Sequence, residues 1–416
     1  MLEYHGLEEH HIGQENNQSI YMKKNIKNIF YITCICLLQT SCQESNASHE
    51  SKIESPVEIF NQEENEISFL FMGDFMQHQP QIDAAKTKNN EYDYHHYFDY
   101  TGSLINGVDF AIANLEVTLA GEPYAGYPKF CAPDEYAIAI KDAGFDVLTT
   151  ANNHSNDRGS KGLERTINIL DSLKIPHLGT YINEAERKSQ YPFIINKNNI
   201  KVALLNYTYG TNGLATKYPN IVNMIEEDMI LSDIKECRES NVDKIIAIMH
   251  WGTEYLSFPD KYQKKWGEWL LSNGVDIVIG GHPHWVQPIE FRDKDSVNNE
   301  KLIVWSLGNI VSNQRREHTD GGSSLQFSIY RNENGEVGLK DVGYHLHWVW
   351  KYEKDNQTKY QILPISKIEK MNIQFDEKSK KEMNIFINNE RSLYNNNNIN
   401  APEYKYNQED DSYLLQ

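Results

Sequence analysis

The chain has 416 residues, of which 39% are hydrophobic and 11% aromatic, so it is long enough for one large α/β domain with appendages or for two ordinary domains. Charged residues make up 24% of the chain and are mixed in sign, which excludes a globally disordered protein. Asp and Glu number 59 against 40 Lys and Arg, giving a formal net charge of −19. A chain of this sign does not neutralise a phosphate backbone, so nucleic acid is not an expected partner.

The N-terminal region has the features of an export signal. Residues 1–21 are polar and acidic and are interpreted as a misassigned extension, with translation starting at Met22. Basic residues follow Met22, and an apolar stretch over residues 29–38 precedes Ser41, which is the pattern of a signal peptide over residues 22–41. The apolar stretch is too short to span a bilayer permanently.

Cys42 follows directly after Ser41 and resembles the cysteine of a bacterial lipoprotein box, which is acylated as the first residue of the mature chain. Gln39 stands where that box usually has Leu, so plain cleavage and an uncleaved anchor are alternatives. Residues 42–65 are rich in Gln, Glu, Ser and Asn without apolar periodicity, which is typical of a flexible tether. These features predict an exported lipoprotein of the bacterial cell envelope, held at the membrane through its N-terminal lipid.

From residue 66 onward, short apolar runs alternate with segments of helical periodicity. Apolar runs of this length predict strands buried on both faces, as parallel sheets require. The runs lie at Ile67–Met72, Val108–Asn114, Phe145–Thr150, Lys201–Tyr207, Lys244–His250, Val275–Gly280 and Leu302–Leu307. The helical patterns lie at Asp134–Ala143, Gly159–Lys174, Glu226–Ser240 and Lys261–Asn273. The alternation predicts an α/β domain over residues 66–390 with a largely parallel sheet.

After about residue 320 the pattern changes to alternating polar and apolar residues, at Ser324–Arg331 and Val337–Lys351. Asn334-Gly335 between these segments is a hairpin signal, so we expect an antiparallel end to the sheet. A last helix is expected over Asp376–Asn389, followed by a polar tail over residues 391–416.

Polar residues able to bind metals follow directly after most of the predicted strands. Loops at the carboxyl ends of strands in an open parallel sheet converge on one crevice, so these residues should meet in space. The set offers carboxylates, an amide oxygen and imidazoles, at Asp74, Glu116, Asn153, His154, His250, His282 and His284. A single tetrahedral zinc needs only three or four ligands, so a set of this size favours two divalent cations that share a bridging carboxylate. Mixed nitrogen and oxygen donors without a thiolate suit Mn, Zn and Fe alike.

Taken alone, most of these motifs have a purely structural explanation. Gly73-Asp74 is by itself a turn, and Glu116 is by itself a solvated or capping carboxylate. His282-Pro283-His284 is different, because it places two imidazoles on one tight turn after an apolar strand, which favours function. Four other histidines have no such setting and are expected on the surface or in packing: His95, His96, His345 and His347.

Six motifs together resemble those of the bacterial capsule synthesis proteins of the CapA type, which are associated with poly-γ-glutamate capsules. They are Gly73-Asp74, Asn114-Leu115-Glu116, Asn152-Asn153-His154, His250-Trp251-Gly252-x-Glu254, Gly281-His282-x-His284 and Ser306-Leu307-Gly308-Asn309. CapA-type proteins are in turn similar to calcineurin-like metallophosphoesterases. The resemblance covers roughly residues 66–312, and it implies a metallo-dependent phosphatase-like sandwich of two mixed β-sheets flanked by helices, with a two-metal site at the strand ends.

The resemblance also implies roles for individual residues. The first metal would be bound by Asp74 and His284, the second by Asn153, His250 and His282, and Glu116 would bridge both. His154 would act as a general acid or transition-state stabiliser, oriented by Asp157 or Glu254.

Two departures from the phosphoesterase pattern bear on the metal site. Phosphoesterases usually have a histidine two positions after the first aspartate, where this chain has Met76, and the nearest histidine is His78. The first metal site is therefore expected to be weaker or differently filled. The bridging acid, Glu116, is longer than the usual Asp and should alter the spacing of the metals.

Three functions are consistent with these features. The leading hypothesis is a metal-dependent hydrolase that acts on a phosphoester or on a γ-glutamyl polymer. The second is a non-catalytic accessory protein that binds, anchors or exports the anionic capsule polymer. Because the negative net charge repels such a polymer, this function requires a local basic rim. The candidate rim residues are Lys129, Arg158, Lys161, Arg315 and Arg316. A closed structural metal site is the third, and the surplus of donors argues against it.

Overall fold

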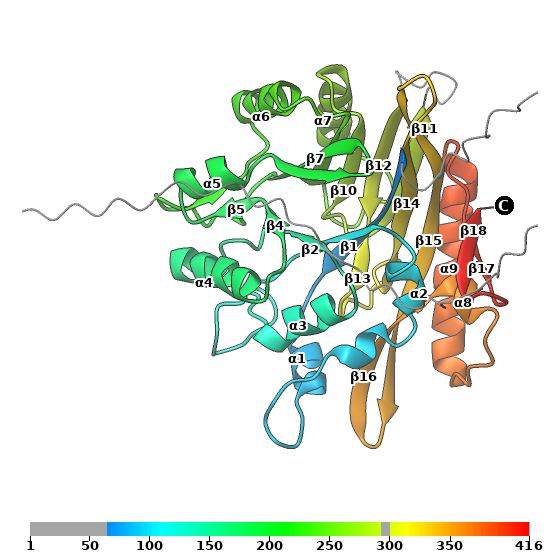
Figure 1. Ribbon diagram of the computed structural model, residues 1–416. Coiled ribbons are helices and arrows are strands. Elements are labelled where there is room, and N and C mark those ends of the chain that lie inside the picture. The colour runs from blue at the N-terminus through cyan, green and yellow to red at the C-terminus, as the bar shows by residue number, and fades with distance from the viewer. Residues whose placement is uncertain (1–64, 293–299, 416) are drawn as a thin grey trace, which may run out of the picture. The chain divides into compact units, whose positions relative to one another are not determined.

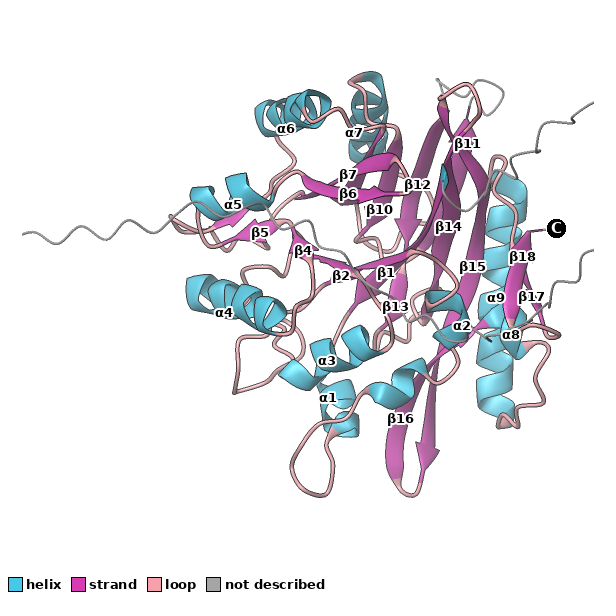
Figure 2. Ribbon diagram, viewed as in Figure 1, coloured by secondary structure: helices cyan, strands magenta, loops and turns pink. Residues whose placement is uncertain are grey.

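The computed structural model describes residues 65–292 and 300–415. The predicted extension, the signal peptide, Cys42 and nearly all of the tether lie outside these residues. Two β-sheets dominate the described part (Figures 1 and 2). The larger sheet has the strand order β16-β15-β14-β1-β2-β3-β4, with β13 paired to β1, and the smaller has the order β11-β12-β10-β9-β7-β6.

The strands of the larger sheet are β1 (Glu66–Phe75), β2 (Phe110–Leu115), β3 (Val147–Thr149), β4 (His177–Leu178), β13 (Asn309–Val311), β14 (Gly321–Arg331), β15 (Val337–Lys354) and β16 (Gln357–Pro364). The smaller sheet contains β6 (Phe193–Lys197), β7 (Ile200–Thr208), β9 (Lys244–His250), β10 (Ile277–Gly281), β11 (Val286–Arg292) and β12 (Lys301–Leu307). Two small antiparallel pairs complete the β-structure of the described residues: β5 (Thr180–Tyr181) with β8 (Ile221–Val222), and β17 (Tyr404–Asn407) with β18 (Ser412–Leu415).

The helices of the described residues are α1 (Gln79–Ala85), η2 (His95–Phe98), α2 (Gly102–Ile105), α3 (Asp134–Asp142), α4 (Gly159–Ser172), α5 (Glu184–Gln190), α6 (Glu227–Glu239), α7 (Lys261–Ser272), α8 (Ile365–Ile368) and α9 (Glu377–Asn397). In Figure 1, α3 and α4 flank the strands β1 to β4, whereas α6 and α7 flank the smaller sheet. Each of these four helices buries apolar side chains, as an amphipathic surface helix does.

The seven predicted strands all form, but they are divided between two sheets. In the larger sheet β1, β2 and β3 are parallel, and in the smaller sheet β7, β9, β10 and β12 are parallel. The single largely parallel sheet predicted from the apolar runs is therefore wrong, because such runs report burial and not which strands pair. The sandwich of two mixed β-sheets flanked by helices, implied by the family resemblance, is confirmed.

The alternation of side chains along β1 explains how this strand joins two cores. Ile67, Phe69 and Phe71 belong to the hydrophobic cluster that also contains the strands of the smaller sheet, so they lie between the sheets. Leu70 and Met72 point the opposite way, into the cluster that includes α3. Full burial of each large apolar side chain contributes roughly 1.5–3 kcal/mol, so the end of β1 is held firmly from both sides.

The C-terminal part agrees with the prediction up to α9 and then departs from it. β14 and β15 are antiparallel and are joined through the Asn334-Gly335 turn, as predicted. The prediction of a polar tail over residues 391–416 has to be corrected, because α9 continues to Asn397 and is followed by the strand pair β17 and β18. Tyr394 and Tyr404 are buried there, and Tyr394 packs edge-on against Tyr344 with ring centroids 4.4 Å apart. Two buried tyrosines in an Asn-rich segment were too sparse a signal to predict this packing.

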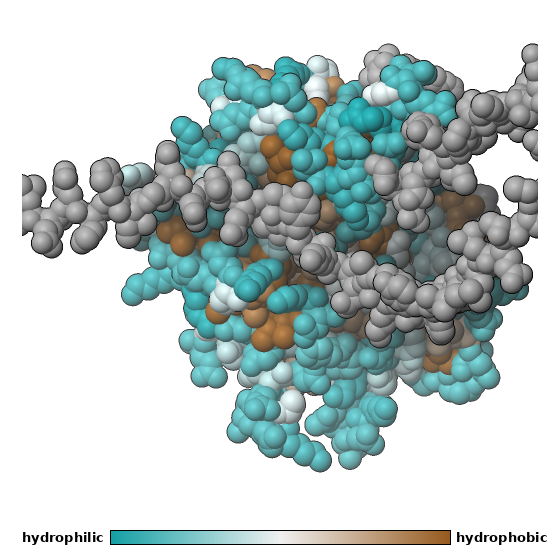
Figure 3. Space-filling model, in the orientation of Figure 1, coloured by the Kyte–Doolittle hydropathy of each residue, from teal (hydrophilic) through white to brown (hydrophobic). Residues whose placement is uncertain are grey.

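On the face drawn in Figure 3, the described residues that are free of grey atoms present mostly hydrophilic side chains, in keeping with the acidic composition. None of the helices within residues 65–292 and 300–415 combines the length and the apolar character that crossing a membrane requires. Cys131 and Cys237 are buried and unpaired, as expected of isolated core cysteines.

Candidate metal centre

Asp74 lies at the carboxyl end of β1, where both sheets approach one another. It is fully buried, and its register partners on β2 and β13 are Asn114 and Asn309. Asn114 Nδ2 donates to Asp74 Oδ1 over 2.8 Å. The neighbouring Gly73 is required by close packing, because a Cβ at that position would lie 1.9 Å from the carbonyl oxygen of Gly308. The turn after β12 therefore packs directly against the strand that carries Asp74.

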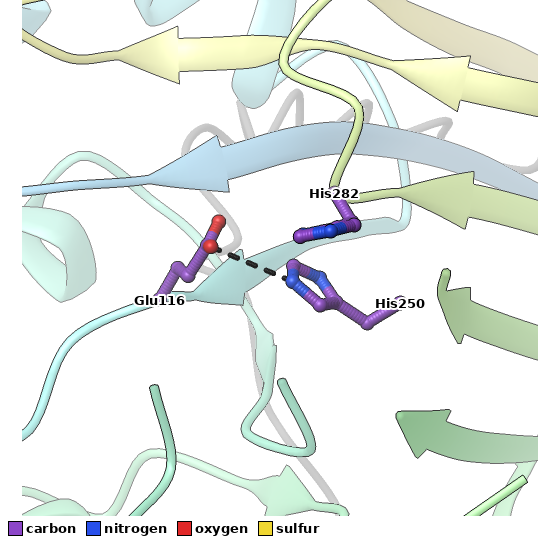
Figure 4. Close-up of side chains that lie close together, drawn as sticks. All are labelled: Glu116, His250 and His282. Atoms are coloured by element: carbon purple, nitrogen blue, oxygen red, sulfur yellow. Dashed lines mark ion pairs between the residues drawn. The ribbon is translucent and has the colours of Figure 1, made fainter. Parts of the chain in front are cut away.

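Glu116 follows the end of β2 and is also fully buried. Neither of its carboxylate oxygens accepts a hydrogen bond. The nearest basic atom is His250 Nε2, 3.4 Å from Oε1, and Figure 4 shows the carboxylate directed at that ring with the His282 ring beside it. A buried carboxylate without hydrogen-bond donors is costly, and native proteins keep such a group only where a partner compensates it.

His250 is the last residue of β9 and brings an imidazole from the smaller sheet into the centre. Its Nε2 lies 2.9 Å from Asn153 Oδ1 and its Nδ1 lies 4.0 Å from Asp74 Oδ1. Asn153 comes from the loop after β3, so this contact joins the two sheets. The amide oxygen, the imidazole and the two carboxylates thus converge from four different strand ends.

The turn after β10 supplies two further imidazoles. The backbone N–H of His282 donates to Asp74 Oδ2 over 3.2 Å, and His282 Nδ1 is buried with no hydrogen-bond partner. His284 Nδ1 lies 3.0 Å from Asn309 Oδ1 and 3.5 Å from Asp74 Oδ2. Both histidines have positive φ angles, 94° and 57°, a backbone conformation that costs a non-glycine residue about 1–3 kcal/mol and is concentrated at functional sites.

The pKa values of the two imidazoles of this turn are shifted in opposite directions. Burial, reinforced by the neighbouring His250 and His284, holds the pKa of His282 well below its usual value, so its ring nitrogens are available as ligands. For His284 burial acts in the same direction, but the negative charges of Glu116 and Asp74 overcome it and raise the pKa to about 9. Burial alone would raise the pKa of Asp74, yet the hydrogen bond from His284 and the charge of His250 hold that pKa below its ordinary range.

His154 lies beside the centre and not among its donors. Its Nδ1 lies 2.8 Å from Asp157 Oδ2, and the same oxygen accepts the backbone N–H of Phe130 over 2.6 Å. The His154 ring stands edge-on to Phe130 with centroids 4.6 Å apart. Of the two carboxylates suggested to orient His154, the structure places Asp157 against it, whereas Glu254 lies beside His284 with Oε1 4.0 Å from Nε2.

A cavity of about 660 Å³ opens over the centre. His154, Asp157, Glu254 and His284 line it together with Met76 and His78, aromatic side chains and amide groups. Of the five basic residues considered for a rim, Lys129 lines the cavity and is exposed. Arg316 lies over the ring of Tyr255, 4.9 Å from its centroid, while the guanidinium of Arg315 donates to the Val349 carbonyl over 2.8 Å.

The donor atoms form three overlapping groups in which the ligand atoms lie within 4.8 Å of one another. The groups are Glu116 with His250 and His282, Asp74 with Glu116 and His284, and Glu254 with His282 and His284. The unpartnered oxygens of Glu116 and the unpartnered Nδ1 of His282 fit a divalent cation, and the mixed donors suit Mn, Zn or Fe. The geometry therefore supports metal binding by these residues.

Two asparagines in the centre were not predicted as site residues. Asn114 donates to Asp74, and Asn309 contacts His284. Asn114 lies two residues before Glu116, and Asn309 directly follows Gly308. Their position at the end of a buried strand was the available signal, but an asparagine there is common in turns and was not distinguished from one.

The family model for the bacterial capsule synthesis protein PGA_cap matches residues 68–314. The capsule biosynthesis protein CapA of Bacillus anthracis is 27% identical over 310 residues, which cover 71% of this chain and 71% of that protein. The PGA biosynthesis protein CapA of Bacillus subtilis (strain 168) is 25% identical over 325 residues, which cover 75% of this chain and 80% of that protein.

Among solved structures, a putative 5'-nucleotidase from Staphylococcus aureus matches with a TM-score of 0.45 and 14% identity, over 78% of this chain and 58% of that one. The NAD nucleotidase of Haemophilus influenzae matches with a TM-score of 0.42 and 13% identity, over 79% of this chain and 60% of that one. This chain thus spans less than two thirds of either structure.

Proposed function

This chain belongs to the bacterial capsule synthesis protein family PGA_cap, and from that premise we propose that it is a metal-dependent hydrolase of the cell envelope that acts in capsule biosynthesis. The observation that supports this proposal best is Glu116, whose two carboxylate oxygens are buried without a hydrogen-bond donor among imidazoles. A carboxylate in that setting is poised to accept a cation.

We assign two divalent cations to the centre. Glu116 belongs to two of the donor groups, one with His250 and His282 and the other with Asp74 and His284, so it would be a ligand of both cations. Asn153 adds its amide oxygen next to His250. Leaving an ion unpaired in a protein interior costs several kcal/mol, which cations at Glu116 offset.

The bound cations would supply Lewis acidity, polarising the scissile group and lowering the pKa of a water molecule. The chain's own contribution is orientation and proton transfer. Asp157 holds Nδ1 of His154, which leaves Nε2 as the nitrogen available to a substrate in the cavity. From there His154 donates a proton to the leaving group, and general acid catalysis of this kind contributes about 10²–10⁴-fold to a rate.

The substrate is an anionic capsule polymer or a phosphoester. A centre that polarises a phosphoryl oxygen also polarises an amide carbonyl, so hydrolysis of a phosphoester and of a γ-glutamyl bond are both within its chemistry. The name of the Bacillus subtilis relative, a PGA biosynthesis protein, supports the polymer. The cavity of about 660 Å³ over the centre offers room for part of such a chain.

The site of action is the bacterial cell envelope, where acyl chains on Cys42 attach the protein to a membrane. This part of the proposal rests on the N-terminal sequence, where Cys42 follows a basic and apolar stretch. Labelling with a fatty acid in a bacterial host should place radioactivity on the wild type and none on Cys42→Ser. Equal labelling of both proteins would contradict the assignment.

Metal-depleted protein reloaded with Mn²⁺, Zn²⁺ or Fe²⁺ should hydrolyse an aryl phosphate, poly-γ-glutamate or both, and His250→Ala should lose bound metal and turnover. His95→Ala is the matched control, because His95 is exposed and its partners Asp93 and Asp142 are exposed as well. Metal binding with no turnover of either substrate, together with unchanged polymer binding by His250→Ala, would favour the accessory role over the hydrolase.

A further inference from the structure

The proposed centre lacks a donor where the strand that presents Asp74 ends. Met76 lies two residues after Asp74 and its side chain lines the cavity together with those of His284 and Glu254. A thioether is a poor ligand for the harder divalent cations. The first cation would then have three protein ligands, Asp74, Glu116 and His284, and would have an open position for a fourth.

Glu254 is the carboxylate that faces this position. It lies in the loop between β9 and α7, and its Oε1 is 4.0 Å from His284 Nε2. Ligand atoms of Glu254, His282 and His284 all lie within 4.8 Å of one another. The side chain of Glu254 is 41% exposed, so it reaches the centre from the open cavity.

The backbone fixes Glu254 to the histidine turn. The N–H of Trp251 donates to the carbonyl of Gly281 over 3.1 Å, and the N–H of Tyr255 donates to that of Pro283 over 2.8 Å. Two hydrogen bonds therefore tie the loop to the turn on either side of Glu254. Gly252 has a φ of 87° and lies so close to Gln263 that a Cβ would meet that side chain at 2.4 Å, which holds the loop in this path.

The histidines that face Glu254 also have unfilled bonding capacity. His282 is 3% exposed, and its Nδ1 has no hydrogen-bond partner. Within the described residues, the ion pair that Glu254 forms is the one with His284. Because His282 also belongs to the donor group of Glu116 and His250, His284 is the imidazole that Glu254 would share with the first cation.

We propose that Glu254 is a metal ligand that fills the position which Met76 leaves open at the first cation. The inference rests on the proposed metal centre and adds one ligand to it. Glu254 then controls how tightly the first cation is held, because its carboxylate is the one ligand of the set that approaches from solvent. The pairing of Asp157 with His154 already accounts for the orientation of His154, so Glu254 is not needed for that role.

The test is a metal titration of three full-length proteins: the wild type, Glu254→Gln and Glu268→Gln. Glu268→Gln is the matched control, because it removes the same charge from α7, where the exposed pair with Arg292 contributes little stability. Co²⁺ is added to each metal-depleted protein, and the visible absorption bands report the stoichiometry and the coordination of each bound ion.

The wild type and Glu268→Gln should bind Co²⁺ alike. In Glu254→Gln one of the ions should bind more weakly by at least about tenfold, because losing even an outer partner of a metal ligand costs about 10–100-fold. Unchanged affinity and spectrum in Glu254→Gln, with metal bound by the wild type, would overturn the inference and leave the metal centre standing. Absence of Co²⁺ binding by the wild type would overturn both.

Discussion

Two His-x-His pairs in this chain have the same spacing and the same burial but opposite surroundings. His282 and His284 lie on the turn after β10 among carboxylates, and His345 and His347 lie within β15. His345 Nε2 contacts Gln326 Oε1 over 2.8 Å, and His347 Nε2 contacts the Asn309 carbonyl over 3.1 Å. Both pairs contain buried nitrogens without a partner, so an unpartnered imidazole does not by itself define a metal site.

The carboxylates make the difference between the pairs. Burial lowers the pKa of His345 to about 3 and that of His347 to about 4. Burial is as complete at His284, yet Glu116 and Asp74 raise its pKa to about 9. The strand pair therefore consists of neutral packing residues, whereas the turn pair is part of a charged centre.

The largest expected effect comes from truncating one histidine of each pair. His282→Ala should lose bound metal and at least about 10³-fold in kcat/KM, since a metal centre supplies several kcal/mol of transition-state stabilisation. His347→Ala should keep its metal and lose about 2–4 kcal/mol of unfolding free energy through the cavity and the lost hydrogen bond. Metal content, rates and denaturant unfolding measure these outcomes. Equal metal loss in both variants would show that the two His-x-His pairs do not differ in metal binding.

A third kind of histidine sharpens the comparison, because His154 has one carboxylate partner and no place among the ligands. His154→Ala should lower kcat by about 10²–10³-fold without changing the metal content, as expected for loss of a general acid. Asp157→Asn should lower kcat less. If His154→Ala instead lost its metal, His154 would belong to the centre itself.

The strand pair also predicts a pH dependence of stability. The folded pKa of His347 is about 4, below its ordinary value of 6.5, so the unfolded chain binds the proton more readily. The stability from neutral His347 is fully present above pH 6.5 and is lost as the pH falls toward 4. Between pH 7 and pH 5 the wild type should lose about 1–2 kcal/mol more than His347→Gln, which keeps a hydrogen-bond donor but does not titrate. Parallel pH profiles would show that folded His347 takes up a proton as readily as the unfolded chain does, which would contradict the prediction.

The smallest effect is expected at the mouth of the cavity, where Lys129 is exposed. Lys129→Gln should weaken binding of an anionic polymer by no more than about fivefold at low salt, because a solvent-exposed charge pair contributes about 0.2–1 kcal/mol. Lys161→Gln is the control, since Lys161 is exposed and does not line the cavity. Identical salt-dependent affinities for the two variants would show that Lys129 does not contact the polymer.

The sequence located the strands and the residues at their carboxyl ends, because both depend on local patterns. The apolar run before Asp74 and the His-Pro-His turn can both be recognised from the sequence alone. How strands pair depends on contacts between distant segments, so the apolar runs alone did not divide the strands between two sheets, whereas the family resemblance implied that division. The centre forms all the same, because both sheets direct the ends of their parallel strands to the same place.

Other features could not be predicted from local sequence patterns, because they depend on side chains that meet only in the folded protein. Glu254 is four residues from His250, yet it lies against His284, which comes from another strand. Asn309 supports His284 from the start of β13. The tyrosines of the C-terminal segment are buried by β15, which no local periodicity in that segment indicates.

The bridging role of Glu116 is the claim on which the hydrolase rests, and electron paramagnetic resonance of the Mn²⁺-loaded protein examines it. The wild type should bind about two equivalents of Mn²⁺ and show the spectrum of a spin-coupled pair, as expected for ions about 3.5–4 Å apart. Glu116→Gln should lose the coupling. A wild-type spectrum of isolated Mn²⁺ ions, unchanged by that substitution, would contradict the two-cation centre.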